Sequence, residues 1–180
     1  MNNLELRKIT LGDRVAFEKA DSLFPKENDF EFVPLVFRGS GQGFESLLEC
    51  FKSYEVGKDL PEGHVASTML FAFNFEGEIV GRVSVRHALN DYLLQFGGHI
   101  GYGVLPKFRN LGYATRILRE TLIFCQNQLN LPRVLLTCNT DNQGSIRTIE
   151  KNGGILESVV SSPSRSVPTR RYWIDLQVSS

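Results

Sequence analysis

Residues 100–118, IGYGVLPKFRNLGYATRIL, join two kinds of local structure within a short stretch of chain. The first residues alternate apolar and small side chains, as in a β-strand, and a basic loop follows them. From about Leu111 to Gln128, apolar residues recur with the spacing of an amphipathic helix. Its apolar face consists of Ala114, Ile117, Leu118, Thr121, Leu122 and Cys125. The stretch therefore predicts a strand, a loop and a helix N-terminus that meet at one point.

The meeting point has the composition of an anion-binding site. Gly112 and Ala114 keep side-chain bulk away from the backbone, and Arg109 supplies a positive charge. The unpaired amides and the dipole of a helix N-terminus favour a phosphate group. The sequence has no P-loop, and a dinucleotide fingerprint that begins at Gly101 fails because Pro106 stands at its third glycine position. The predicted ligand is a phosphate ester, bound by the pattern Arg-x-x-Gly-x-Ala.

Length and composition limit the class of protein. The 180 residues are 42% hydrophobic and 22% charged, which predicts one globular domain over residues 1–180. Twenty basic residues balance twenty acidic ones, so we expect neither nucleic acid nor an anionic membrane as a partner. The start of the chain does not resemble a signal peptide and no run of eighteen apolar residues occurs, so we expect a cytoplasmic protein. Cys50, Cys125 and Cys138 lack metal-ligand spacing, which predicts reduced thiols and no metal.

The pattern of the second half of the chain predicts further strands and helices. Residues 67–87 are typical of an antiparallel hairpin around the turn EGE, and residues 133–138 of a buried strand. Residues 142–154 are typical of a short helix that two glycines end, and residues 155–160 and 170–178 of two final strands. This order predicts a mixed sheet covered by helices.

The first half is less regular. Residues 4–10 alternate like a strand, and residues 11–24 have helical spacing with Asp13 as the expected cap. The expected apolar face of this helix is Leu11, Val15, Phe17 and Leu23. Residues 43–57 also have helical spacing.

Two linked motifs resemble the GCN5-related N-acetyltransferase (GNAT) superfamily. Arg109-x-x-Gly112-x-Ala114 matches that family's pyrophosphate-binding signature, Gln/Arg-x-x-Gly-x-Gly/Ala, and follows a strand as it does there. Residues 142–154, NQGSIRTIEKNGG, look like the second motif, Asn-x-x-Ser/Ala near the start of a helix that ends in Gly. The resemblance covers residues 67–178 well and is most specific to a group of mostly bacterial predicted acetyltransferases. It implies an α/β (α+β) fold with a mixed, mostly antiparallel central sheet of about seven strands flanked by helices.

The resemblance also implies an activity, the transfer of an acetyl group from acetyl-CoA to a primary amine by direct attack in a ternary complex. Amides from Arg109 to Thr115 would bind the phosphates, and the preceding strand would bind the pantetheine arm, with the Val104 amide on the thioester oxygen. Asn142 would contact the cofactor arm or cap its helix, and Ser145 would face the sulfur. The implied acetyl-CoA-binding residues are Tyr102, Gly103, Val104, Leu105, Arg109, Asn110, Leu111, Gly112, Tyr113, Ala114, Thr115, Asn142 and Ser145.

The acid that protonates the leaving thiolate differs from the family pattern. Many GNAT enzymes have a tyrosine four residues after the serine of the second motif, whereas this chain has Ile149 there. Ser145, a bound water or Tyr102 is the substitute. Alternatively, the CoA thiolate leaves without protonation, because its conjugate acid resembles a cysteine thiol with a pKa of about 8.5.

His99 is the first candidate for the base, because a histidine of near-neutral pKa on the cofactor strand can relay a proton. Strand alternation places His99 and Val104 on opposite faces, and a packed or hydrogen-bonded histidine is the alternative. Glu157 on a later strand, and His87 and Asp91 after the preceding strand, are further candidates. The expected catalytic residues are His99, Ser145, Tyr102 and Glu157.

The acceptor amine is expected between the N-terminal helices and the connection between the last two strands. Residues 21–59 contain eight acidic residues, against basic residues at four positions. The acidic ones are Asp21, Glu27, Asp29, Glu31, Glu45, Glu49, Glu55 and Asp59. This excess fits a cationic acceptor or charges on solvated helix faces. The sequence leaves open a small-molecule or a protein amine, a homodimer, and a non-catalytic acyl-CoA-binding sensor as the alternative function.

Overall fold

The computed structural model describes residues 4–24, 32–34, 37 and 43–176. In chain order the elements are β1 (Leu4–Arg7), η1 (Leu11–Asp13), α1 (Arg14–Leu23), α2 (Phe44–Glu55), β2 (Ser67–Asn74), β3 (Ile79–Arg86), η3 (Leu93–Gly97), β4 (Ile100–Val104), η4 (Pro106–Phe108), α3 (Tyr113–Leu129), β5 (Arg133–Asn139), α4 (Gln143–Lys151), β6 (Ile155–Val160) and β7 (Thr169–Asp175). The predicted order of strands and helices is confirmed.

The seven strands form two sheets. Sheet A has the order β1-β2-β3-β4 and sheet B the order β5-β7-β6, and neighbouring strands within each sheet are antiparallel. The prediction of a mostly antiparallel arrangement with about seven strands is therefore confirmed. The prediction of one central sheet differs from the structure, which has two sheets. The division falls between β4 and β5, because these strands diverge near their first residues.

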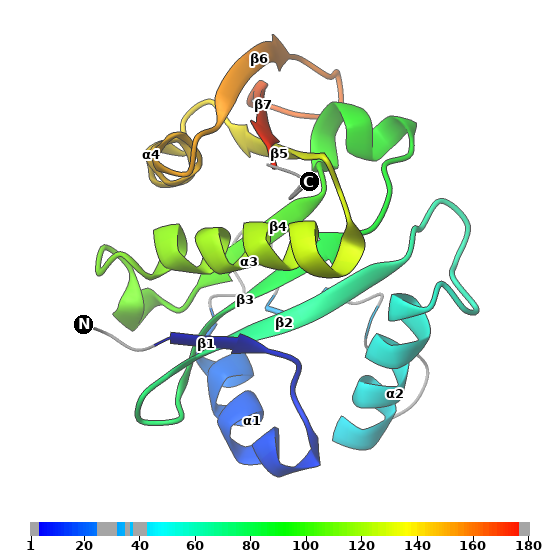
Figure 1. The fold of residues 1–180 in the computed structure, drawn as a ribbon, viewed down its shortest axis with the longest axis vertical. Coiled ribbons are helices and arrows are strands. Elements are labelled where there is room, and N and C mark those ends of the chain that lie inside the picture. Colours follow the sequence, from blue (N-terminus) through cyan, green and yellow to red (C-terminus); the bar gives the residue numbers. More distant parts are fainter. Residues whose placement is uncertain (1–3, 25–31, 35–36, 38–42, 177–180) are drawn as a thin grey trace.

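Helices cover both faces of sheet A. Along β2, Met69, Phe71 and Phe73 pack in the core under α1 and α2, whereas Leu70 and Ala72 pack in the core under α3. Both sets of alternate residues are thus buried, which explains the continuous apolar run of this strand. Figure 1 shows α1 and α2 on one side of sheet A and α3 on the other, with α4 beside sheet B.

The N-terminal helix differs from its predicted face. Phe17 and Ala20 are buried, whereas Leu11, Val15 and Leu23 are exposed by 61%, 78% and 49% of their surface. The difference arises because Leu11 lies in the separate 3-10 turn η1, so the helical phase begins only at Arg14.

The capping role predicted for Asp13 also differs from what is observed. Its carboxylate accepts hydrogen bonds from the Thr10 amide and hydroxyl, at 2.8 and 2.9 Å, and does not cap α1. It also pairs with Arg7 at 2.7 Å. Asp13 therefore closes the turn between β1 and α1 and ties that turn to β1.

A single junction joins β4 to β5. The His99 amide donates to the Leu135 carbonyl at 2.7 Å, and the Leu135 amide donates to Nδ1 of the His99 imidazole at 2.9 Å. Gly98 has a φ of +63°, and a Cβ there would lie 2.6 Å from the Leu135 carbonyl oxygen, so only glycine permits this approach. The imidazole thus takes the place of a strand carbonyl.

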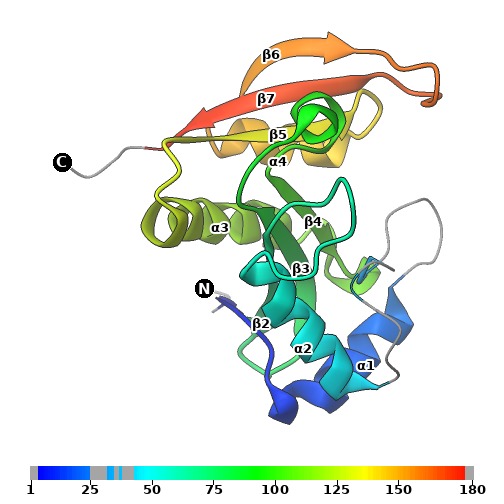
Figure 2. The same ribbon diagram turned by 90° about the vertical axis from the view of Figure 1, so that its right-hand side faces the viewer.

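Beyond this junction, η3 lies between the two sheets. The Thr137 hydroxyl donates to the Phe96 carbonyl at 2.8 Å, and Arg171 of β7 donates to the Leu94 carbonyl at 3.0 Å. Figure 2 shows η3 in green beside β5 and β7, above the strands of sheet A. Beyond His99, sheet B is therefore held by side-chain hydrogen bonds to η3 and not by main-chain hydrogen bonds between β4 and β5.

We expect the junction to weaken in mild acid. Burial and the Arg86 guanidinium lower the pKa of His99 to about 4. The unfolded chain, with an ordinary histidine pKa of about 6.5, therefore binds a proton in this range that the folded chain does not, so the free energy of unfolding falls as the pH drops from about 6.5 to about 4. Urea unfolding at several pH values measures this slope.

The matched variant for that measurement is His99→Asn, whose amide oxygen accepts from the Leu135 amide but does not titrate. The variant should lose stability less steeply than the wild type between pH 6.5 and 4.5. Equal slopes for the two proteins would show that His99 does not titrate with unfolding.

Candidate active site

The edge of β4 that faces away from β3 is open. Leu105 donates its amide to the Val80 carbonyl at 2.9 Å, and alternate residues of an antiparallel strand face the same partner. Gly103 and Leu105 therefore direct their main-chain groups to β3, whereas Tyr102 and Val104 direct theirs to the side from which β5 has diverged. An extended ligand can bind this edge through main-chain hydrogen bonds.

The loop after β4 turns sharply into α3. Asn110 and Gly112 have left-handed backbones, with φ of +62° and +83°. The first bond of the helical ladder runs from the Arg116 amide to the Gly112 carbonyl at 3.2 Å, so the amides before it lie outside the ladder. These amides and the dipole of a 17-residue helix (the anion cradle) are the groups to which the sequence assigns anion binding, and that role stays a prediction.

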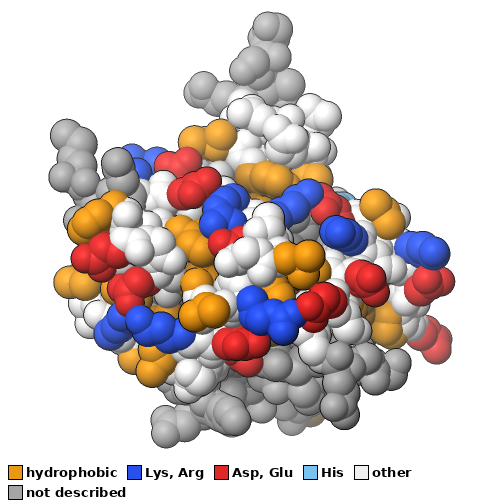
Figure 3. Space-filling view, turned by 90° about the horizontal axis from the view of Figure 1, so that it is seen from below, with side chains coloured by type: hydrophobic (Ala, Val, Ile, Leu, Met, Phe, Trp, Pro, Cys, Tyr) orange, Lys and Arg blue, Asp and Glu red, His pale blue; other side chains and the backbone are white. Residues whose placement is uncertain are grey.

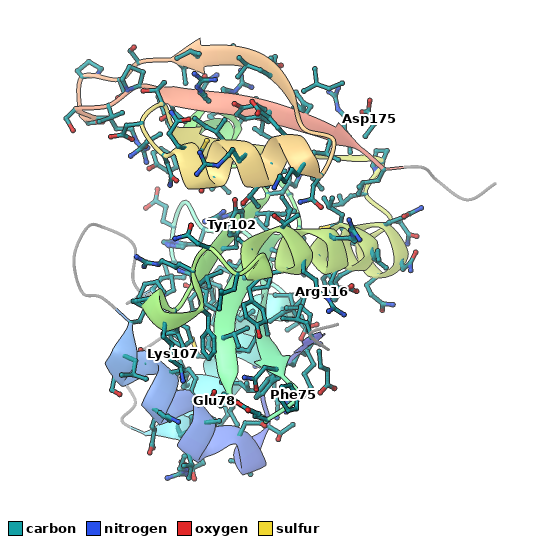
Figure 4. The ribbon with its side chains drawn as sticks, turned by 90° about the vertical axis from the view of Figure 1, so that its left-hand side faces the viewer. Phe75, Glu78, Tyr102, Lys107, Arg116 and Asp175 are labelled. Atoms are coloured by element: carbon teal, nitrogen blue, oxygen red, sulfur yellow. The ribbon has the colours of Figure 1, made fainter. Side chains whose placement is uncertain are left out.

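The basic side chains of this loop are held by the protein itself. Arg109 Nε donates to the Val104 carbonyl at 3.1 Å, which fixes the loop against β4. Lys107 Nζ lies 3.0 Å from Glu78, which also pairs with Lys19 of α1 at 2.9 Å. Figure 4 shows Lys107 and Glu78 at the lower end of β4, below Tyr102. Main-chain amides, rather than Lys107, are thus the groups that the loop offers to an anion.

The N-terminal part of α4 lies near Tyr102 of β4. Asn142 Oδ1 accepts from the Ser145 amide at 3.0 Å, which confirms the capping alternative for this residue. A cofactor contact of the same side chain stays a prediction. Ser145 is half-buried on the face of α4 turned toward Tyr102.

Tyr102 projects into the space between the two sheets (Figure 4). Its hydroxyl is buried near the hydroxyls of Ser145 and Thr148, without a hydrogen bond of good geometry to any residue in the described part of the chain. Burial raises its pKa, so the hydroxyl is protonated at neutral pH. Sequence reasoning missed Thr148, although its position three residues after Ser145 places the two on one helical face.

The two expected bases have other partners. His99 is 7% exposed, its Nδ1 accepts from the Leu135 amide, and its ring lies edge-on to Trp173 at 6.3 Å between centroids. Glu157 pairs with Arg171 at 2.5 Å and accepts from the Trp173 indole at 3.0 Å. The structure therefore connects His99 and Glu157 through Trp173, and brings neither to the open edge of β4 beside Tyr102.

Main-chain bonds within the protein already engage two of the expected pantetheine-binding residues. The Leu105 amide donates to the Val80 carbonyl, and the Leu105 carbonyl accepts from the Phe108 amide at 2.9 Å. The carbonyl of Gly103 lies against Gly81, where a Cβ would come within 2.6 Å of it. Ile149 is 1% exposed in the core under α3 and α4, so apolar packing fills the position of the family tyrosine.

The acidic excess of the N-terminal helices is partly neutralised. Glu45 pairs with Arg14, and Glu55 pairs with Lys8. Glu27, Asp29 and Glu31 lie outside the described residues. Figure 3 shows acidic and basic side chains interspersed on the face seen from below. In the described part of the chain, this surface has no acidic patch that would select a cation.

Comparison of the sequence with known protein families identifies the family of this chain. A model described as an acetyltransferase (GNAT) domain matches residues 3–155. The chain therefore belongs to the GNAT acetyltransferases. The two predicted motifs lie at the start of α3 and at the start of α4, on either side of the point where β4 and β5 diverge.

Individual relatives are distant. The uncharacterized N-acetyltransferase YnaD of Bacillus subtilis (strain 168) is 30% identical over 83 residues, which span 44% of this chain and 47% of that protein. A mutant spermidine N-acetyltransferase from Vibrio cholerae has a TM-score of 0.66 at 16% identity, covering 96% of this chain and 94% of that chain. A GNAT-family acetyltransferase from Streptococcus pneumoniae has a TM-score of 0.66 at 19% identity, covering 97% and 100%. These structures establish the likeness of fold.

None of the helices in the described part of the chain is both long and apolar enough to cross a membrane. No group of three or more His, Cys, Asp or Glu side chains is arranged there to hold a metal ion.

The cradle predicts the effect of a change at Gly112. No atom lies within 4 Å of a Cβ at this position, but the φ of +83° disfavours any other residue. We expect Gly112→Val to distort the loop and raise the dissociation constant for CoA at least about tenfold, which corresponds to about 1.4 kcal/mol. Isothermal titration calorimetry measures this change.

Gly77→Val is the matched control, because Gly77 in the β2–β3 turn has a similar φ of +76° and equally open surroundings. It should lower the melting temperature to a similar extent without changing CoA affinity. Equal CoA affinity for the Gly112 variant and the wild type would refute the cradle.

Proposed function

We propose that the protein transfers an acetyl group from acetyl-CoA to a primary amine by direct attack in a ternary complex. The observation that carries this proposal is the open edge of β4, where Tyr102 and Val104 direct main-chain groups away from β3 beside the N-terminus of α3. The amides that begin α3 would bind the pyrophosphate, and the open edge would bind the pantetheine arm. Acetyl-CoA supplies the activated thioester.

We assign the thioester oxygen to the Val104 amide. Arg109 holds the Val104 carbonyl from the loop, which fixes the orientation of that part of the strand. A donor that is held in place before the reaction stabilises a developing oxyanion without reorganisation.

Tyr102 is the proposed acid for the leaving thiolate. Its hydroxyl is buried between the sheets and its pKa is raised, so it carries a proton at neutral pH. Ser145 and Thr148 are close enough to orient it. Tyr102 would thus replace, from β4, the tyrosine that Ile149 displaces from α4.

We assign His99 to the positioning of β4 and β5, and not to proton transfer. A histidine with a pKa of about 4 and an engaged Nδ1 has little affinity for an ammonium proton. The Arg171 ion pair likewise occupies Glu157. The amine would then lose its proton to solvent.

Direct attack is favoured over an acyl-enzyme by the state of the nearest thiol. Cys138 lies on β5 near Tyr102, and burial raises its pKa to about 11. A thiol of this pKa is almost entirely protonated at neutral pH and is a poor nucleophile. Intersecting lines in initial-velocity plots against acetyl-CoA and amine would support the ternary complex, and parallel lines would contradict it.

Thiol release from acetyl-CoA with a panel of amines, combined with calorimetric binding of CoA, tests the proposal. Release with one class of amine supports the transferase. Tight CoA binding without release from any amine favours the alternative, a non-catalytic acyl-CoA sensor. Absence of CoA binding overturns both.

Replacement of Tyr102 tests the acid. We expect Tyr102→Phe to lower kcat by about 10- to 100-fold, with CoA affinity unchanged within about threefold, because general acid catalysis is lost while packing is kept. Tyr54→Phe is the control, since its hydroxyl is also buried but lies in the core under α1 and α2. Equal kcat values for the Tyr102 variant and the wild type would exclude this role.

A further inference from the structure

The face of β3 toward α1 and α2 is polar where it runs beside β4. Val83 and Val85 pack in the core under α3, so by strand alternation Arg82, Ser84 and Arg86 face the other side. Their neighbours on β4 are small, because Arg82 is paired with Gly103 and Ser84 with Gly101. The charged side chains of this strip are Arg82 and Arg86.

Arg86 lies at one end of the strip in a largely desolvated position. Burial lowers its pKa from the usual arginine value. Its Nη1 donates to the carbonyls of Gly97 and Gly98, both at 3.2 Å. Carbonyl groups satisfy donors but do not neutralise a charge, and a buried charge is normally paired with an opposite one.

Arg86 has no carboxylate partner among the described residues, whereas three other arginines do. Arg7, Arg14 and Arg171 each form an ion pair with a carboxylate. Within residues 4–24, 32–34, 37 and 43–176, no carboxylate lies within 4 Å of the Arg86 guanidinium. Both of its hydrogen bonds to described residues use Nη1, which leaves Nε and Nη2 as donors for a further group.

Arg82 is the other arginine of the strip. Its side chain is buried, with the residue 2% exposed, and Nη1 donates to the Gly101 carbonyl at 3.1 Å. The two arginines lie four residues apart in sequence on one face of β3, and both guanidinium groups lie beside Gly101.

The position of Arg86 relates this charge to the proposed chemistry. A Cβ at Gly101 would lie 3.6 Å from Nη1 and 3.7 Å from Nη2 of Arg86, so the guanidinium rests against the backbone of Gly101. Tyr102 is the next residue. At about 3.3 Å per residue, Val104 lies about 10 Å further along the strand. A group bound at Arg86 is therefore within the length of a small amine from the proposed thioester position.

We infer that Arg86 binds a carboxylate of the acceptor, and that the acceptor is an amino acid or short peptide amine, and not a polyamine. This inference rests on the proposed transferase function. A guanidinium presents paired N–H donors that match the two oxygens of a carboxylate. A polyamine such as spermidine would instead bring further positive charge beside the Arg86 guanidinium.

Matched pairs of amines that differ only in the carboxylate test the inference. The pairs are lysine and cadaverine, ornithine and putrescine, and dialanine and its C-terminal amide, with spermidine as an additional probe. In thiol release from acetyl-CoA, we expect the acid member of at least one pair to have a kcat/KM at least about tenfold above its partner and above spermidine. Equal or higher values for spermidine or for the members without a carboxylate would overturn the inference.

Variants of Arg86 test whether this residue causes the preference for amines that carry a carboxylate. Arg86→Gln should reduce the preference for the acid member at least about tenfold, mainly through KM, and Arg86→Lys should restore part of it. Arg119→Gln, an exposed arginine on α3, is the control and should keep the wild-type preference. The wild-type comparison of the pairs does not depend on any variant folding correctly. An unchanged preference in a folded Arg86→Gln protein would refute the role of this residue.

Calorimetry separates failure of the carboxylate site from failure of the transferase activity. If no amine is acetylated, the binding of the same pairs of amines to the CoA-saturated protein is measured. Tighter binding of the acid members supports the carboxylate site, and equal or absent binding refutes it. If the protein does not bind CoA, the transferase proposal fails and the inference fails with it.

Discussion

The hydrogen bond from the Leu135 amide to the His99 imidazole is the constraint on which the open edge of β4 depends. If a main-chain carbonyl of β4 accepted this bond instead, β5 would continue to pair with β4 as far as Tyr102, and the edge of β4 would be covered. The His99 imidazole accepts the hydrogen bond of the Leu135 amide in β5. Because a side chain and not the β4 backbone is the acceptor, the two backbones can separate beyond this point. The low exposure of His99 and its lowered pKa follow from the same packing, since the ring must stay neutral to accept.

β4 presents different chemistry on each of its sides. One main-chain edge is used by β3, and the other lies open beside the N-terminus of α3. The side chain of Tyr102 projects between the sheets, while the guanidinium of Arg86 lies against the backbone of Gly101. The proposed donor and acceptor would therefore meet across a single strand. Ile100 and Val104 of this strand are buried in the core under α3.

Local pattern was sufficient to predict the elements but not their connections in space. Residues 100–118 predicted the β4–α3 junction, because strand alternation, a left-handed glycine and a helical stripe are all local properties. The open edge required two facts that no local pattern contains, namely that β4 and β5 diverge and that His99 points in the plane of the sheets. The direction of the Leu105 and Gly103 main-chain groups toward β3 depends on strand register, which no local pattern contains. The expected apolar face of α1 was wrong because a 3-10 turn at Leu11 shifts the start of the helix.

The geometry of the proposed ligand site depends on residues that need not touch a ligand. Gly98 and His99 lie where β4 and β5 stop pairing. A Cβ at Gly98 would lie 2.6 Å from the Leu135 carbonyl oxygen, so a larger residue there would shift β5 relative to β4. Mutations at this junction can therefore abolish function without altering a side chain at the open edge of β4, and a genetic screen confined to that edge would miss them.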